Sequence, residues 1–242
     1  MFPHHRRARA AVRAAVLVPA LVIGLAACDG GGEAEPDPAP TSAAPTPLAD
    51  IDTTTFTVGR VSFCDAVPED ATADVLGGEV GEAAPYENGS VAEVAPGVED
   101  RVHETGCRWY GEGDAAALTT PLASAWVFAP PVTPEQAEQY AAAAVGEGCR
   151  AVEGQPAYGA ATVATVCRTP VPGTETTPEA VVTEVAFRGL FGDAWLTCAL
   201  RAPTAGGPSD AAPPTDDELF ERAGVWCGQV ALAGAVEPET TG

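Results

Sequence analysis

The residues of this chain best suited to chemistry are its cysteines, of which the 242-residue sequence has seven. Cys28 stands apart near the N-terminus, and the other six are spread between Cys64 and Cys227. Cysteines can act as nucleophiles, bind metals or form disulfides. No Cys-x-x-Cys pair occurs and the spacings match no zinc module, so the even set of six favours three disulfides in an exported protein.

Other catalytic chemistry has few candidates in the sequence. After residue 28 the only histidine is His103, which we expect to be a surface or edge residue, and no serine lies in a Gly-x-Ser-x-Gly motif. The sequence also lacks a two-histidine metal motif and a glycine-rich phosphate loop. We therefore assign no catalytic, metal or cofactor-binding residue and expect a protein that is not an enzyme. The 34 acidic residues leave an envelope hydrolase with paired carboxylates as an alternative.

The N-terminal segment has the layout of an export signal. Four arginines in the first 13 residues precede an apolar stretch, 14–27. This stretch is too short to span the hydrocarbon core of a membrane, which needs about 20 residues. Leu25-Ala26-Ala27-Cys28 resembles the lipobox of bacterial lipoprotein signal peptides. The resemblance implies that residues 1–27 are removed after general secretory export. Cys28 would then carry the lipid that holds the protein at the outer face of the cytoplasmic membrane.

The charge of the chain restricts its partners. Four of the 12 basic residues lie in 1–27, which leaves eight arginines against 34 acidic residues and no lysine. This balance argues against nucleic acid and against electrostatic adhesion to an anionic membrane surface, because both need basic residues. Attachment to the membrane would therefore depend on the lipid at Cys28. Residues 28–53, rich in Pro, Gly, Ala and Thr, are expected to form a disordered tether.

Residues 54–234 are expected to form a single disulfide-linked α+β domain, followed by a flexible tail, 235–242. The predicted strands cover 55–63, 101–110, 122–128, 162–168, 180–188 and 194–201. Helices are predicted to begin near Pro68, after Thr133 and after Thr215, the last two with capping boxes. A long acidic loop is expected around Asn88. Short links between strands predict an antiparallel sheet with about three helices on one face.

This map of elements narrows the 15 pairings that six cysteines allow. Pairing in chain order joins a helix region to a strand three times. The predicted disulfides are Cys64–Cys107, Cys149–Cys167 and Cys198–Cys227.

Several features together resemble a known group of proteins. The lipobox, the tether, Phe63-Cys64 before a short helix, and Cys107-Arg108-Trp109 are similar to actinobacterial cell-envelope lipoproteins of unassigned function and to related extracellular sensor-type domains. The resemblance implies a compact α+β domain with a groove between sheet and helices, and it supplies no catalytic residue.

We therefore expect a membrane-anchored lipoprotein that acts as a non-catalytic accessory or sensor module. Its partner would be an unidentified envelope ligand or protein. A purely structural interaction protein is a further alternative. The tryptophans could line a ligand cleft, but those beside cysteines, Trp109 and Trp226, are expected in the core.

Overall fold

The computed structural model describes residues 45–89, 91–95, 98–101, 103–146, 148–174, 179–205 and 213–236. The chain divides into two units, residues 1–42 and 43–242, and every described residue belongs to the second. The predicted signal segment, Cys28 and most of the predicted tether lie outside the described residues. The same holds for the end of the predicted tail, from residue 237.

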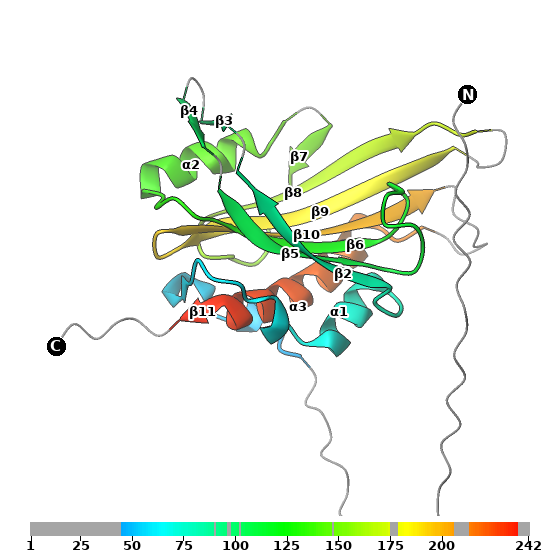
Figure 1. Cartoon of the computed structure of the whole chain (residues 1–242), viewed down its shortest axis with the longest axis horizontal. Coiled ribbons are helices and arrows are strands. Elements are labelled where there is room, and N and C mark those ends of the chain that lie inside the picture. The colour runs from blue at the N-terminus through cyan, green and yellow to red at the C-terminus, as the bar shows by residue number, and fades with distance from the viewer. Residues whose placement is uncertain are drawn as a thin grey trace, which may run out of the picture. The chain divides into compact units, whose positions relative to one another are not determined.

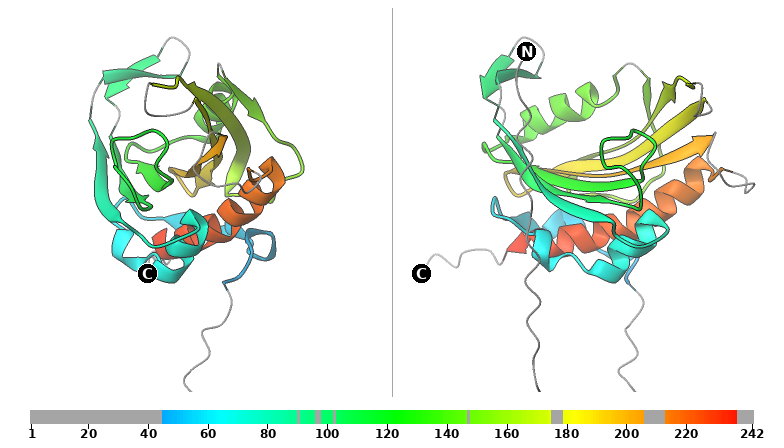
Figure 2. Two further views of the ribbon diagram at one scale, coloured as in Figure 1. Left: turned by 90° about the vertical axis from the view of Figure 1, so that its right-hand side faces the viewer. Right: turned by 45° about the vertical axis from the view of Figure 1, so that its right-hand side comes forward.

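The centre of the fold is a seven-stranded antiparallel sheet (Figure 1). From one edge to the other its strands are β2 (Glu82–Asn88), β5 (Glu104–Tyr110), β6 (Leu122–Phe128), β10 (Ala194–Ala205), β9 (Ala180–Phe191), β8 (Ala160–Val171) and β7 (Cys149–Ala151). Figure 2 shows that this sheet is strongly twisted and curls across its width. With three α-helices, the fold is α+β, as the sequence predicts.

Two of the predicted loop and strand assignments are wrong. The acidic segment expected as a loop around Asn88 forms strand β2 and a hairpin of β3 (Val91–Ala95) and β4 (Val98–Arg101). Glutamates and prolines lower strand propensity, but β2 is an edge strand whose outer side needs no pairing.

The strand predicted over 55–63 is the second wrong assignment, because it shrinks to β1 (Thr57–Val58), which pairs with β11 (Ala235–Val236). Three short 3-10 helices, at Leu48–Asp50, Thr53–Thr55 and Cys64–Ala66, complete this part of the chain.

The hairpin of β9 and β10 is longer and tighter than the sequence suggested. Both strands run past their predicted ends, 188 and 201, and they are joined by a two-residue turn, Gly192-Asp193. Gly192 has φ +66°, a conformation that glycine adopts without steric cost. Gly189, just beyond the predicted end of its strand, lies within β9, where a Cβ would collide with the carbonyl oxygen of Tyr158.

The three helices are α1 (Glu69–Leu76), α2 (Pro134–Ala143) and α3 (Asp216–Gly234). The capping boxes predicted at Thr133 and Thr215 are present. In each, the threonine hydroxyl accepts from the backbone N–H of the third helix residue, and that residue's side chain accepts from the threonine's backbone N–H. Leu219, Ala223, Trp226 and Val230 form one apolar face of α3, and each is at most 1 % exposed.

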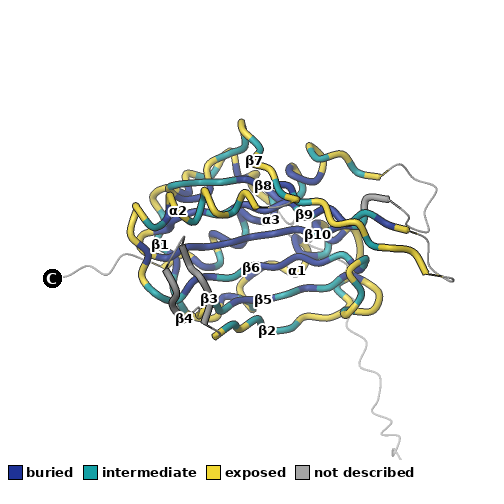
Figure 3. The backbone as a smooth tube through the Cα atoms, turned by 90° about the horizontal axis from the view of Figure 1, so that it is seen from above, coloured by how far each residue is buried: buried dark blue, intermediate teal, exposed yellow. Residues whose placement is uncertain are grey.

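The helices do not all lie on one face, contrary to the prediction. Helices α1 and α3 cover one face of the sheet, and α2 lies on the other (Figure 1). The reason is a second apolar cluster on that other face, where Phe128, Leu190 and Trp195 pack with Ala137 of α2. The main core lies between the sheet and α3, and the central strands are the most buried part of the domain (Figure 3).

The six cysteines form three disulfides in the described structure, Cys64–Cys107, Cys149–Cys167 and Cys198–Cys227, which is the pairing predicted from chain order. Trp109 and Trp226 meet edge to face in the core, with ring centroids 5.6 Å apart. The packed region also begins earlier than Thr54, since Leu48 and Thr53 are buried against it. The Thr53 hydroxyl donates to the carbonyl of Ala157.

Candidate functional site

The sheet face that carries α2 is the strongest candidate for a functional surface, and we call it the α2 face. Side chains alternate along a strand, and the register of the ladder fixes which residues share a face. The polar and aromatic side chains of the α2 face are Tyr86, Glu104, Arg108, Tyr110, Ser124, Trp126, Thr165, Glu184, Arg188, Thr197 and Arg201. The face toward α3 is mostly apolar, with Arg168 and Thr183 as polar exceptions toward one end of β8 and β9, so the sheet separates its core from a polar surface.

Small residues line the middle of the α2 face. Ser124, Ala199, Ala186 and Thr165 are cross-strand neighbours on β6, β10, β9 and β8, and each is buried. Longer side chains stand on either side of this row, with Arg188 and Trp126 toward α2 and Glu184 and Arg201 away from it. The arrangement places charged groups at both sides of a low floor.

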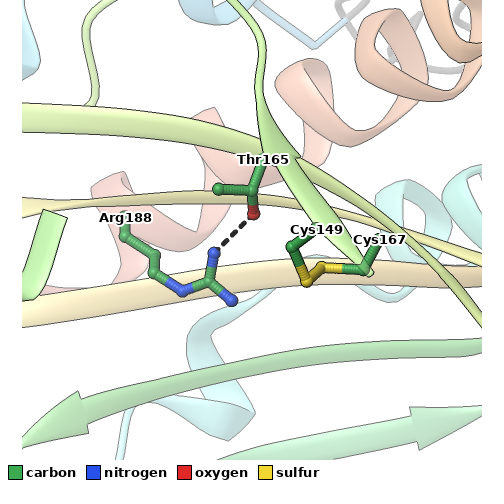
Figure 4. Close-up of a disulfide and its surroundings, with 4 residues drawn as sticks. All are labelled: Cys149, Thr165, Cys167 and Arg188. Atoms are coloured by element: carbon green, nitrogen blue, oxygen red, sulfur yellow. Dashed lines mark hydrogen bonds between the residues drawn. A yellow bond between two sulfur atoms is a disulfide. The ribbon is translucent and has the colours of Figure 1, made fainter. Parts of the chain in front are cut away.

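Arg188 is partly buried and has one hydrogen-bond partner among the described residues. Its Nη1 donates to the hydroxyl of Thr165 over 2.7 Å, and Thr165 is itself fully buried (Figure 4). Figure 4 places this pair beside the Cys149–Cys167 disulfide. Burial lowers the pKa of Arg188, and the nearby charge of Glu184 partly opposes that shift. No described carboxylate lies within 4.0 Å of this guanidinium.

Arg201 has an even less complete environment. Its Nη2 makes a long contact of 3.5 Å with the carbonyl of Thr120, and its buried Nε has no hydrogen-bond partner among the described residues. Burial lowers the pKa of Arg201, again opposed by Glu184. Glu184 is its direct cross-strand neighbour, yet no ion pair within 4.0 Å joins the two described side chains.

The third arginine, Arg108, belongs to an aromatic group at the β2 edge of the sheet. Its guanidinium carbon lies 4.3 Å from the ring centre of Tyr86, and that ring also meets Trp126 edge to face at 5.5 Å. The Tyr86 hydroxyl donates to Glu104 over 2.6 Å. Burial and this hydrogen bond to a carboxylate raise the pKa of Tyr86 to about 12. The group is held by cation–π and charge-assisted contacts.

A cavity of about 300 Å³ opens on the α2 face next to the Cys149–Cys167 disulfide. Its walls come from β7, β8, β9, β10 and the loop before β6, and the lining residues are Leu118, Cys149, Cys167, Thr169, Val182, Glu184 and Arg201. The cavity therefore combines an apolar wall with one carboxylate and one guanidinium. Its volume is at the lower end of the range for small-molecule sites, about 300–1,000 Å³.

The remaining arginines of the described structure differ from those on the α2 face. Three of them form ion pairs: Arg60 with Asp193, and both Arg150 and Arg168 with Asp216. A larger cavity, of about 550 Å³, lies at the N-terminus of α3 beside Arg150 and Arg168. Both guanidiniums there are ion-paired with Asp216, and Asp217 also lines the cavity, so this cavity offers a weaker site for an anion.

The histidine and carboxylate candidates do not assemble into a catalytic group in the described structure. The His103 side chain is exposed and has no hydrogen bond to a described serine; its carbonyl accepts from the amide of Ala129. Glu184 lies in the same cross-strand row as Tyr110. Tyr110 is six residues from Glu104 along β5. At about 3.4 Å per residue these two carboxylates are about 20 Å apart along the strands, beyond the 5–10 Å of a glycosidase pair.

Sequence reasoning missed the charged residues of the α2 face. Arg188, Arg201 and Glu184 were taken simply as parts of strands. The available signal was their position, because each interrupts an otherwise apolar strand that pairs on both sides. A charge in such a strand costs free energy unless the folded protein gives it a partner or a use.

Metal and membrane sites are considered for the described residues, 45–236 with the gaps given above. Among them, no group of three His, Cys, Asp or Glu side chains is arranged to hold a metal ion. No helix in the described part of the chain is long and apolar enough to cross a membrane. Comparison with known proteins adds no assignment, since no protein-family model matches the chain and no curated protein matches it.

Proposed function

We propose that this protein is a membrane-anchored, extracytoplasmic lipoprotein whose domain binds an acidic ligand on the α2 face without chemical conversion. One observation carries the proposal: Arg188 and Arg201 are partly buried on the same face and lack a described carboxylate within 4.0 Å. The three disulfides indicate an oxidising, extracytoplasmic compartment, which agrees with this role.

Burial of the two arginines has a free-energy cost that an anionic ligand could partly recover. Removing a guanidinium from water costs free energy, and a paired carboxylate or phosphate recovers part of that cost. The lowered pKa of Arg188 and Arg201 shows that burial dominates over their present partners. An anionic ligand would supply charge-assisted hydrogen bonds to N–H groups that the protein leaves unused.

The absence of conversion is part of the proposal and has its own basis. The acidic residues on this face are far apart along the strands, as described above, and Glu104 is engaged by Tyr86. His103, the only histidine after residue 28, is exposed at the start of β5. No nucleophile, base and orienting group therefore converge at the cavity among the described residues.

A binding measurement with simple probes tests the ligand class. We expect the full chain in detergent to bind N-acetyl-dialanine, which has one carboxylate, and to bind its carboxamide at least about tenfold more weakly, since a charge-assisted hydrogen bond contributes about 1.5–3 kcal/mol. Isothermal titration calorimetry measures both constants. Equal affinity for acid and amide, or no binding of either, would contradict the proposed recognition of an acid.

The anchor is tested separately from the ligand. In cells, Cys28→Ser should release the protein from the membrane fraction or leave it unprocessed, because the lipid would be its only attachment. Cys149→Ser/Cys167→Ser is the control, since those cysteines are disulfide partners and their loss should leave the protein in the membrane fraction. Membrane retention of Cys28→Ser with normal processing would contradict the anchor.

A further inference from the structure

We infer that the cavity beside the Cys149–Cys167 disulfide takes a small zwitterionic ligand, with a carboxylate held by Arg201 and a protonated amine held by Glu184. Amino acids and short peptides with free ends have this chemistry. The inference rests on the proposed function and makes it more specific, because recognition of an acid requires Arg201 alone, whereas recognition of a zwitterion also requires Glu184.

The two charged residues of the cavity lie side by side in the sheet. Glu184 and Arg201 are direct cross-strand neighbours on β9 and β10 and both line the cavity. Such neighbours have Cβ atoms about 4.5–5.5 Å apart, close enough for an ion pair. The structure nevertheless has no ion pair within 4.0 Å between these described side chains.

Arg201 and Glu184 both lack close hydrogen-bond partners among the described residues. Arg201 has an unpartnered buried Nε and only a long contact to Thr120. Among the described residues Glu184 has no hydrogen bond, and it interacts with Arg188 and Arg201 through longer-range electrostatics. A donor and an acceptor of opposite charge are therefore both available in one cavity.

A zwitterionic ligand could supply a partner of opposite charge to both Arg201 and Glu184. A carboxylate matches the planar fork of a guanidinium, and an ammonium group donates to a carboxylate. A ligand with anionic groups alone would place negative charge beside Glu184, where the Coulomb interaction is repulsive. The apolar wall formed by Leu118, Val182 and the disulfide suits a small aliphatic side chain between or beside the charged ends.

The test compares three probes on the full chain in detergent by titration calorimetry: dialanine, N-acetyl-dialanine and dialanine amide. Dialanine has both charges, and each of the others lacks one. We expect dialanine to bind about tenfold or more tightly than either derivative, because each loses one charge-assisted contact. In Glu184→Gln, dialanine and N-acetyl-dialanine should bind within about twofold of each other. Glu153→Gln, at an exposed turn outside the cavity, is the matched control and should keep the difference.

Two results would overturn the inference, and they differ in what they leave standing. If N-acetyl-dialanine binds as tightly as dialanine to the wild-type chain, the zwitterion is not recognised, while the proposed recognition of an acid stands. If neither probe binds, both the inference and the proposed function fail. Retention of the preference in Glu184→Gln, with the fold intact by circular dichroism, would also overturn the assignment of the amine to Glu184.

Discussion

At the scale of single residues, Arg188 and Tyr158 show two ways in which this domain buries a polar group. Arg188 has a hydrogen bond to Thr165 and lies on the α2 face, where the cavity lined by Arg201 and Glu184 opens, so its burial can serve binding. Tyr158 is completely buried against Phe187 and Phe191, and its hydroxyl has no hydrogen-bond partner in the part of the chain that the structure describes. Burial raises its pKa well above the usual range. Its polar atom has no use in our account.

Tyr158→Phe tests that distinction. Removing a hydroxyl that is buried without a partner eliminates its desolvation cost and keeps the ring contacts, so the free energy of unfolding should stay the same or rise by about 1 kcal/mol. Urea denaturation followed by tryptophan fluorescence measures it. A decrease of more than about 1 kcal/mol would show that the hydroxyl does have a partner, such as a buried water.

Tyr86 gives a prediction about pH. Its folded pKa of about 12 lies above the usual value of 10.0 because of burial and the hydrogen bond to Glu104. The folded state therefore holds this proton more tightly, and the associated stability is complete below pH 10 and lost as the pH rises toward 12. We expect the unfolding free energy of Tyr86→Phe to fall less steeply than that of the wild type over this window. Denaturation curves at several pH values measure this dependence. If the unfolding free energies of the variant and the wild type fall equally steeply with pH, the assignment is contradicted.

At the scale of elements, the sequence predicts what local patterns determine and misses what tertiary contacts determine. The capping boxes at Thr133 and Thr215 are local, and both were predicted. The position of α2 was not, because nothing within that helix shows which face of a distant sheet will carry Phe128, Leu190 and Trp195. The β2 strand was missed because an edge strand tolerates residues that strand propensities disfavour.

The candidate site follows the same division. The disulfides follow from cysteine parity and the coarse order of elements. The α2-face arginines could not be grouped from the sequence, because their proximity depends on the register between β8, β9, β10 and β6. A slip of one residue in that register would move Arg188 and Glu184 to the opposite face.

The Cys198–Cys227 disulfide connects the sheet to α3 and should stabilise the domain more than the Cys149–Cys167 disulfide does. Both cysteines are fully buried, and the bond closes a loop with a sequence separation of 29. Cys198→Ala/Cys227→Ala should lower the unfolding free energy by about 3–4 kcal/mol or prevent folding. The Cys149–Cys167 disulfide joins neighbouring strands and is partly exposed. Its removal in Cys149→Ser/Cys167→Ser should therefore lower the unfolding free energy by less. Thermal unfolding by calorimetry compares them, and a larger loss in the second variant would contradict this ranking.

At the scale of the whole molecule, the distribution of charge gives the α2 face its significance. The chain has a formal net charge of −22, and a strongly acidic protein repels anions at long range. An acidic ligand must therefore be held by short-range contacts. Three of the arginines whose side chains the structure describes lie on the α2 face, while three others form ion pairs with aspartates at the surface.

The central claim is that the unpaired arginines of the α2 face bind an acid, and its most direct test is the affinity of N-acetyl-dialanine for two matched variants. Arg201→Gln removes the guanidinium that lines the cavity on the α2 face. Arg150→Gln removes a charge that is already paired with Asp216. We predict that Arg201→Gln weakens binding about tenfold or more, while Arg150→Gln changes it less than twofold. Equal affinities of Arg201→Gln and the wild type, both folded, would contradict this claim.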